Sequence, residues 1–190
     1  MSTGFFKVPK AKNEVVKSYA KDSFERDEVK KVYNKMFTSN VEIPMYINGE
    51  DIQTNKKEKI NPPHDHKKVV GEYFLASPKN IDYAIASALE AKESWSSMSW
   101  ENRSAVFLKA AELIAGPYRY KINAATMIGQ SKTVHQAEID SACELIDFLR
   151  FNVEYVTQIY SNQPVSDNDS WNRVESVSYT HLTLPTKQAV

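Results

Sequence analysis

The apolar residues between Ile139 and Tyr160 recur at alternating steps of three and four along the chain. This spacing places one continuous apolar stripe on a helix. The sequence therefore predicts a long helix after His135 that packs against a large surface. The predicted stripe consists of Ile139, Ala142, Ile146, Leu149, Val153, Val156 and Tyr160.

Serines that can cap helix starts precede three further helical patterns. Ser23 comes before a short helix, Ser77 is followed by a proline that suits the first helical position, and Ser99 begins the next helix. Gly116 is expected to end that helix in the left-handed conformation, ahead of a proline. A fourth helix is expected over about 118–127. The expected buried side of the helix after Ser99 is Val106, Phe107, Ala110, Leu113 and Ile114.

Short strands are expected before these helices. Asn48-Gly49 lies between two short apolar segments, 43–47 and 50–52, and favours a hairpin with a type I′ turn. Residues 68–75 read as another strand, whereas the two prolines in 61–66 exclude regular structure there. Strands followed by a helical layer are typical of part of an α/β protein.

Composition narrows the class of protein only mildly. Lys plus Arg and Asp plus Glu both total 24, which gives no support for a nucleic-acid or anionic-membrane partner. A single cysteine suits a reducing compartment, and no apolar run is long enough to span a membrane. The N-terminus lacks the features of a secretory signal or an Arg-rich transit peptide. We therefore expect a cytoplasmic protein, bacterial by preference, with the mitochondrial matrix as the alternative.

Few residues offer visible chemistry. The five glycines are too scattered to form a phosphate-binding loop, so no nucleotide site is expected. His64 and His66 lack further ligands at suitable spacing, so a polar turn is favoured over a metal site. Cys143 lies within the helical pattern beside the apolar stripe, which favours a buried packing thiol over a nucleophile. We predict no catalytic residue and no metal ligand.

The polar run from Gln130 to Glu138 allows two interpretations. In the first, Ser131 or Thr133 caps a helix and Glu138 lies near the helix N-terminus, where a carboxylate is favoured. In the second, Glu138 reaches a cleft and holds a cationic group of a substrate, with His135 or Gln136 as neighbours.

Several long motifs occur in an order that resembles a known family. The runs FLKAAELIAGPYRYKINAA and TMIGQSKTVHQAEIDSACELIDFLRFN are similar to the N-terminal region of the L-glutamate γ-semialdehyde dehydrogenases, also called Δ1-pyrroline-5-carboxylate dehydrogenases. NPPHDHKKVVGEY, a helix ending in Trp95, and Trp171-Asn172-Arg173 extend the resemblance over about 13–175. The Arg103–Ile114 pattern is similar to the wider aldehyde dehydrogenase superfamily. The GQSKTVHQAEID run narrows the resemblance to the pyrroline-carboxylate branch of this superfamily.

The resemblance implies an NAD-dependent enzyme of proline catabolism that oxidises glutamate γ-semialdehyde to glutamate. In such enzymes a cysteine thiolate attacks the aldehyde, hydride passes to NAD, and water activated by a general base hydrolyses the thioester. The resemblance places the nucleophile, the base and the cofactor site beyond this chain. Only Glu138, in the QAEID motif, carries over as a candidate substrate contact, through the substrate ammonium. A small-molecule substrate and a homo-oligomer are implied for the complete enzyme.

The expected fold is thus the incomplete N-terminal part of the aldehyde dehydrogenase fold, with short strands, a helical layer and a long helix. We expect an N-terminal arm over 1–22, the truncated dehydrogenase domain over 23–175 and a non-native tail over 176–190. The chain by itself is expected to be inactive. The alternative is a noncatalytic module that docks on full-length subunits.

Overall fold

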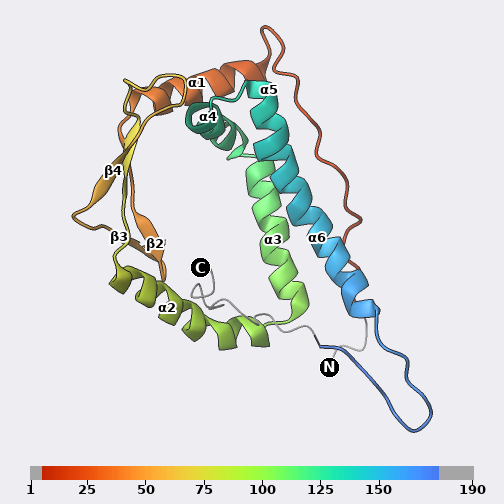
Figure 1. The fold of residues 1–190 in the computed structure, drawn as a ribbon. Coiled ribbons are helices and arrows are strands. Elements are labelled where there is room, and N and C mark those ends of the chain that lie inside the picture. Colours follow the sequence, from red (N-terminus) through yellow and green to blue (C-terminus); the bar gives the residue numbers. More distant parts are fainter. Residues whose placement is uncertain (1–5, 176–190) are drawn as a thin grey trace, which may run out of the picture.

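Twelve elements form an open frame in the computed structural model, which describes residues 6–175. α3 and α6 run antiparallel along one side of the frame, the strands lie across from them, and α2 runs along the bottom from the strands to the start of α3 (Figure 1). The mixture of helices and short strands is the expected one. The elements are α1 (Phe24–Thr38), β1 (Val41–Ile43), β2 (Met45–Ile47), β3 (Glu50–Ile52), β4 (Lys57–Ile60), β5 (Gly71–Phe74), α2 (Pro78–Ser97), α3 (Trp100–Ala115), α4 (Arg119–Gln130), α5 (Val134–Ala137), the π-helical turn η1 (Glu138–Cys143) and α6 (Glu144–Ser161).

The predicted helix starts are confirmed. The hydroxyls of Ser23, Ser77 and Ser99 each accept a hydrogen bond from the amide three residues later. These bonds satisfy donors that a helix start leaves free. Gly116 does end α3, but the expected left-handed conformation is wrong, because its φ is −101°. The left-handed residue is instead Ser131 after α4, with φ of 54°.

The strands form two small sheets. β2 and β3 make the predicted hairpin, and both turn residues have positive φ, 53° at Asn48 and 82° at Gly49. β5 is the central strand of the other sheet, parallel to β1 and antiparallel to β4. It is shorter than the expected 68–75, and β4 was not expected. At Gly71 a side chain would collide with the carbonyl oxygen of Val41 on β1, so the close pairing requires glycine.

The predicted apolar stripe forms the main core, with one correction. Ala142 and Ile146 are fully buried, and they pack with Ala111 of α3. Ile139 does not belong to the stripe, because its side chain remains 41% exposed. Regular α-helical spacing would bury Ile139, but this residue lies within the wider π turn η1, which takes its side chain out of line with the rest of the stripe.

The predicted buried side of α3 is largely wrong. Val106, Phe107 and Leu113 are exposed, and the buried residues of α3 are Ser104 and Ala111. Small side chains at these two positions let α3 approach α6 closely, which directs the large apolar residues to the sides of the contact. α2 has no buried residue at all.

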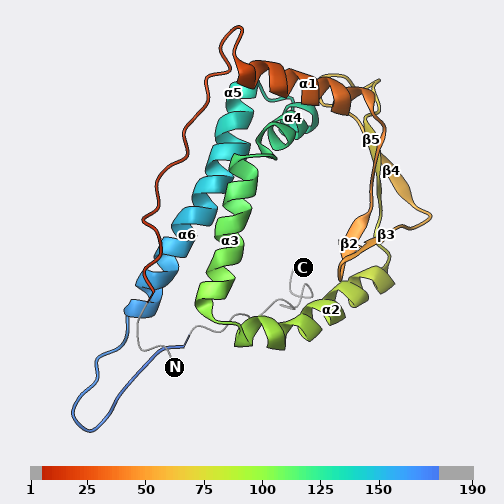
Figure 2. The ribbon, with the colours of Figure 1, turned by 180° about the vertical axis from the view of Figure 1, so that it is seen from behind.

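The N-terminal arm runs in extended form beside η1 and α6 before it turns into α1 (Figure 2). Its backbone amides donate to helix carboxylates, at 2.7 Å from Ala11 to Glu154 and 2.7 Å from Glu14 to Asp147. The arm is therefore fixed by polar contacts to helix side chains and not by pairing in a sheet or a helix. The proposed tail over 176–190 lies outside the described residues.

Candidate functional site around Glu138

Glu138 lies at the first position of η1, and its side chain has no exposed surface. One carboxylate oxygen accepts from the Lys17 amide at 2.8 Å, and the other accepts from the Tyr19 hydroxyl and the Asn123 amide nitrogen, each at 2.7 Å. Both oxygens also face the Arg119 guanidinium. We refer to the side chains that meet here as the Glu138 cluster: Glu14, Tyr19, Arg119, Asn123 and Glu138.

Arg119 joins the arm to the helices of this cluster. The guanidinium is 1% exposed, and it bonds to Glu138, to Glu14 Oε1 at 2.6 Å and to the carbonyl oxygen of Val15 at 2.7 Å. Glu14 is shared with Arg150 of α6, also at 2.6 Å. A buried guanidinium needs paired and hydrogen-bonded partners, and here they come from two separate segments of the chain, the arm and η1.

The cluster keeps its carboxylates ionised. Burial by itself raises the pKa of Glu138, but hydrogen bonds from Arg119, the Lys17 amide, Tyr19 and Asn123 outweigh burial and hold the pKa below the usual 4.5. The pKa of Glu14 is lowered in the same way, against its burial, by Arg119 and Arg150. Burial and the neighbouring Glu138 carboxylate raise the pKa of Tyr19, so that its hydroxyl remains a donor.

The polar run before Glu138 forms a helix cap. Thr133 accepts from the Gln136 amide, and the Gln136 side chain accepts in return from the Thr133 amide at 2.9 Å. His135 is exposed, and the hydrogen bonds of the Glu138 side chain go to other residues than His135 and Gln136. The capping interpretation is therefore confirmed for Thr133. Glu138 itself faces the protein interior, where donors from the chain occupy both of its oxygens.

The other candidate residues add no reactive group to the cluster. Cys143 is 5% exposed, and burial together with the Glu138 charge raises the pKa of its thiol to about 11, so it is a packing residue as predicted. His64 lies 2.7 Å from the Ser131 hydroxyl. Within residues 6–175 no group of three or more potential metal ligands comes together.

Arg119 and Asn123 were not among the predicted site residues, yet they supply most of the hydrogen bonds to Glu138. Both lie on the buried side of α4, four residues apart, beside Ala124 and Ile128. Two polar residues at this spacing on an apolar helix face are a signal for a buried acceptor. In the described part of the chain, Asn123 Oδ1 is the one buried side-chain nitrogen or oxygen atom without a hydrogen-bond partner.

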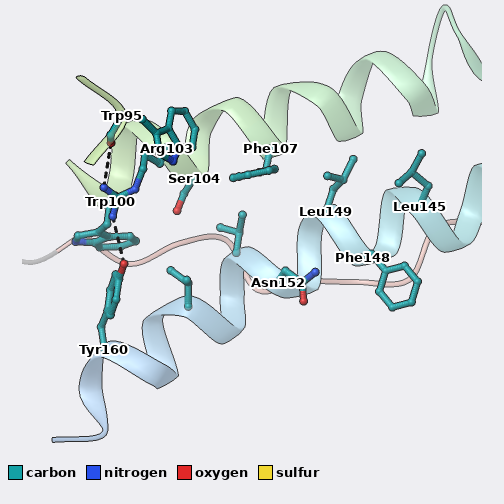
Figure 3. Close-up of a pocket in the computed structure, with 12 residues that line it drawn as sticks. Trp95, Trp100, Arg103, Ser104, Phe107, Leu145, Phe148, Leu149, Asn152 and Tyr160 are labelled. Carbon is teal, nitrogen blue, oxygen red and sulfur yellow. Dashed lines mark hydrogen bonds between the residues drawn. The ribbon is translucent and has the colours of Figure 1, made fainter. Parts of the chain in front are cut away.

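A second feature, the α3–α6 groove, lies on the other side of α6 from the arm (Figure 3). It has a volume of ≈ 560 Å³ and is walled by Trp95, Trp100, Phe107, Leu145, Phe148 and Tyr160. The Trp100 and Tyr160 rings meet edge to face at one end, with centroids 6.2 Å apart. Arg103 holds that end together through the Tyr160 hydroxyl and the carbonyl oxygen of Trp95, each at 3.3 Å.

Comparison with known protein families shows which family this chain belongs to. The model of the aldehyde dehydrogenase family matches residues 48–181, well over half of the chain. The chain belongs to the aldehyde dehydrogenase family. The arrangement of helices and short strands is that of the N-terminal part of the aldehyde dehydrogenase fold. None of the helices in residues 6–175 is both long and apolar enough to cross a membrane.

Individual aldehyde dehydrogenases are similar over nearly the whole chain. A probable delta-1-pyrroline-5-carboxylate dehydrogenase of Schizosaccharomyces pombe is 45% identical over 90% of this chain and 31% of that protein. The human mitochondrial delta-1-pyrroline-5-carboxylate dehydrogenase is 37% identical over 86% of this chain and 29% of its own length. The crystal structure of the Mycobacterium tuberculosis enzyme bound with NAD and cobalamin has a TM-score of 0.87 at 40% identity, over 91% of this chain and 33% of that one. The chain thus spans about a third of these relatives' length.

Proposed function

We propose that this chain is the N-terminal part of a Δ1-pyrroline-5-carboxylate dehydrogenase, which oxidises glutamate γ-semialdehyde to glutamate with NAD as hydride acceptor. The observation that carries the proposal is the 45% identity to the S. pombe relative over 90% of the chain. The GQSKT and QAEID runs, which resemble the pyrroline-carboxylate branch, lie inside the region that the family model matches. NAD, a small-molecule substrate and a homo-oligomeric state belong to the complete enzyme in this proposal.

The described residues support a scaffolding role for this segment, with the reactive groups supplied by another part of the enzyme. The family reaction needs a thiolate, and Cys143 is the single cysteine of the sequence. Its buried thiol, with a pKa of about 11, is protonated at neutral pH and is covered by the arm. The nucleophile therefore has to come from a part of the enzyme that this chain does not supply. The present segment contributes scaffold and positioning.

The substrate-binding role of Glu138 stays a prediction. A substrate ammonium reaches this carboxylate only if the Lys17 amide and the Tyr19 hydroxyl leave it, because both oxygens are already occupied. The contacts favour an indirect role, in which Glu138 fixes the arm and the start of η1. As to location, the human relative's name includes the mitochondrion, which supports the mitochondrial matrix alternative. The cytoplasm remains the other prediction.

A chimeric enzyme tests the proposed function. Residues 13–175 of this chain replace the matching segment of the S. pombe relative, and NADH formation is followed with glutamate γ-semialdehyde. We expect turnover with the semialdehyde and NAD, and none from the 190-residue chain by itself. A folded chimera without activity on the semialdehyde would refute the proposal. Turnover by the 190-residue chain would refute the assignment of the nucleophile to another part.

Glu138→Gln in the same chimera separates its two roles. A direct substrate contact raises the KM for the semialdehyde and leaves the KM for NAD unchanged, beyond the loss of stability that the buried pair with Arg119 predicts in either case. A purely indirect role affects both KM values together.

A further inference from the structure

The arm lies along η1 and α6 and contacts them through its main chain (Figure 2). Three of its backbone amides, spaced three residues apart, each donate to one carboxylate oxygen. The three pairs are Ala11 with Glu154 at 2.7 Å, Glu14 with Asp147 at 2.7 Å and Lys17 with Glu138 at 2.8 Å. The order of these pairs shows that the arm runs antiparallel to α6.

The spacing of the carboxylates suits an extended chain. Three residues of a polyproline II chain span about 9.3 Å. Asp147 and Glu154 are seven residues apart on α6, and seven residues of an α-helix rise about 10.5 Å. The two repeats are similar in length, so the amides and the carboxylates stay in register. The helix therefore recognises an extended segment by main-chain atoms, which the arm of every copy presents alike.

Opposite charge also attracts the arm to this face. Residues 6–17 carry four lysines and one glutamate, whereas residues 138–154 carry five acidic residues and one arginine. Complementary charge of this kind steers association and selects the partner. The arm of a second copy has the same charges, so this face attracts it as strongly as it attracts the arm of its own chain.

The turn between the arm and α1 holds two residues in an unfavourable backbone conformation. Tyr19 has a φ of 51°, and Asp22 has a φ of 62°. The left-handed region costs energy for residues with a side chain, and more for a bulky one than for aspartate. An extended connection would return both residues to negative φ. Short hinges under strain favour the exchange of the attached element between two copies.

α1 has its own anchor, which does not involve residues 6–17. It packs on α4, and Val29 of α1 is only 3% exposed. In the arm itself, Val15 and Val16 remain 76% and 48% exposed. This stretch of the arm therefore adds little apolar burial to its own copy. Its polar contacts can form equally on a second copy that presents the same carboxylates.

We propose that the arm exchanges between two copies of this chain, so that residues 6–19 of each copy bind η1 and α6 of the other. The turn at residues 19–22 opens into an extended connection. The Lys17 amide and the Tyr19 hydroxyl of one copy then complete the hydrogen bonds of Glu138 in the other. Each copy gives one arm and receives one, which closes the pair. The proposal is independent of the proposed function, because it uses only contacts within this chain.

Crosslinking between two single-cysteine variants tests the exchange. Lys10 and Gln158 are exposed and line the same hollow between the arm and α6. Chains with Lys10→Cys and chains with Gln158→Cys are mixed, unfolded in urea, refolded together at high concentration and treated with a short bifunctional thiol reagent. We expect a covalent dimer of one chain of each kind, identified by its mass, whose yield rises with protein concentration. The native Cys143 is buried and does not compete.

Two controls make the crosslink specific. Lys109→Cys on α3, where the side chain is 67% exposed, replaces Gln158→Cys in a second mixture and should give no dimer with Lys10→Cys. Equal yields from the two mixtures would place the contact on another face and overturn the proposal. A double variant with Lys10→Cys and Gln158→Cys reports the closed arm. A crosslink within this double variant, with no dimer from the mixture of single variants at any concentration, would also overturn it.

Substitutions in the hinge test the cause of the exchange. Asp22 is exposed and outside the Glu138 cluster. Asp22→Gly accepts positive φ without cost, so it favours the closed arm and should lower the dimer yield at least about fivefold. Asp22→Val, with a β-branched side chain at the same position, should raise the yield. Equal dimer yields from the two variants would show that the hinge does not drive the exchange, and would overturn the proposal.

Discussion

Replacement of Glu138 by Gln tests the central physical claim about the cluster. The change keeps the size of the side chain but removes the negative charge opposite a guanidinium that is 1% exposed. Removal of one partner from a buried ion pair costs about 3–5 kcal/mol, because the other charge stays buried without compensation. Arg119 retains its pair with Glu14 at 2.6 Å. We therefore expect a loss near the lower end, about 3 kcal/mol.

Urea denaturation followed by circular dichroism measures this loss. A slope of about 2 kcal/mol per molar urea converts the expected loss into a midpoint about 1.5 M lower. Glu112→Gln is the matched control, because that side chain is 70% exposed and pairs only with Lys109 on the surface, at 3.2 Å. The control should change the stability by less than about 0.5 kcal/mol. Equal midpoints for the two variants would show that the Glu138 charge contributes nothing to the fold.

Three further measurements follow from the same contacts. The ionised forms of Glu14 and Glu138 stabilise the folded chain fully above their usual pKa of 4.5, and this stabilisation is lost as the pH falls through their lower pKa values in the folded state. Acid unfolding should therefore be less steep in Glu138→Gln. Identical acid profiles of the two proteins would contradict this prediction. Cys143 should react slowly with a thiol reagent at neutral pH and quickly in urea, and rapid labelling of the native chain would refute its burial beneath the arm. Gly71→Ala should lower the unfolding midpoint by several degrees through its collision with Val41, whereas an unchanged midpoint would show that β1 and β5 adjust.

Local features of the fold could be predicted because they depend on neighbouring residues. The serine caps and the Asn48-Gly49 turn each act within four residues, and all were placed correctly. The Glu138 cluster differs, since the hydrogen bond from Arg119 to Glu14 joins residues 105 positions apart. No local pattern specifies such a pairing. The buried side of α3 could not be predicted either, because Phe107 and Ala111 are both compatible with a core-facing position on a helix. Only the contact with α6 determines that the smaller residue, Ala111, is the buried one.

The wide turn η1 explains why Glu138 and the apolar stripe could not both be interpreted from regular helical spacing. In a π turn the backbone hydrogen bonds join residues five apart, so the turn holds one residue more than a regular α-helical turn. Glu138 and Cys143 are five apart, with Oε1 and Sγ separated by 3.8 Å, and both are buried against the arm. Ala142 and Ile146, four apart across the end of the turn, pack instead on α3. The extra residue thus lets one helix present a charged side to the arm and an apolar side to α3. A deletion that restored regular α-helical spacing would have to give up one of these two contacts.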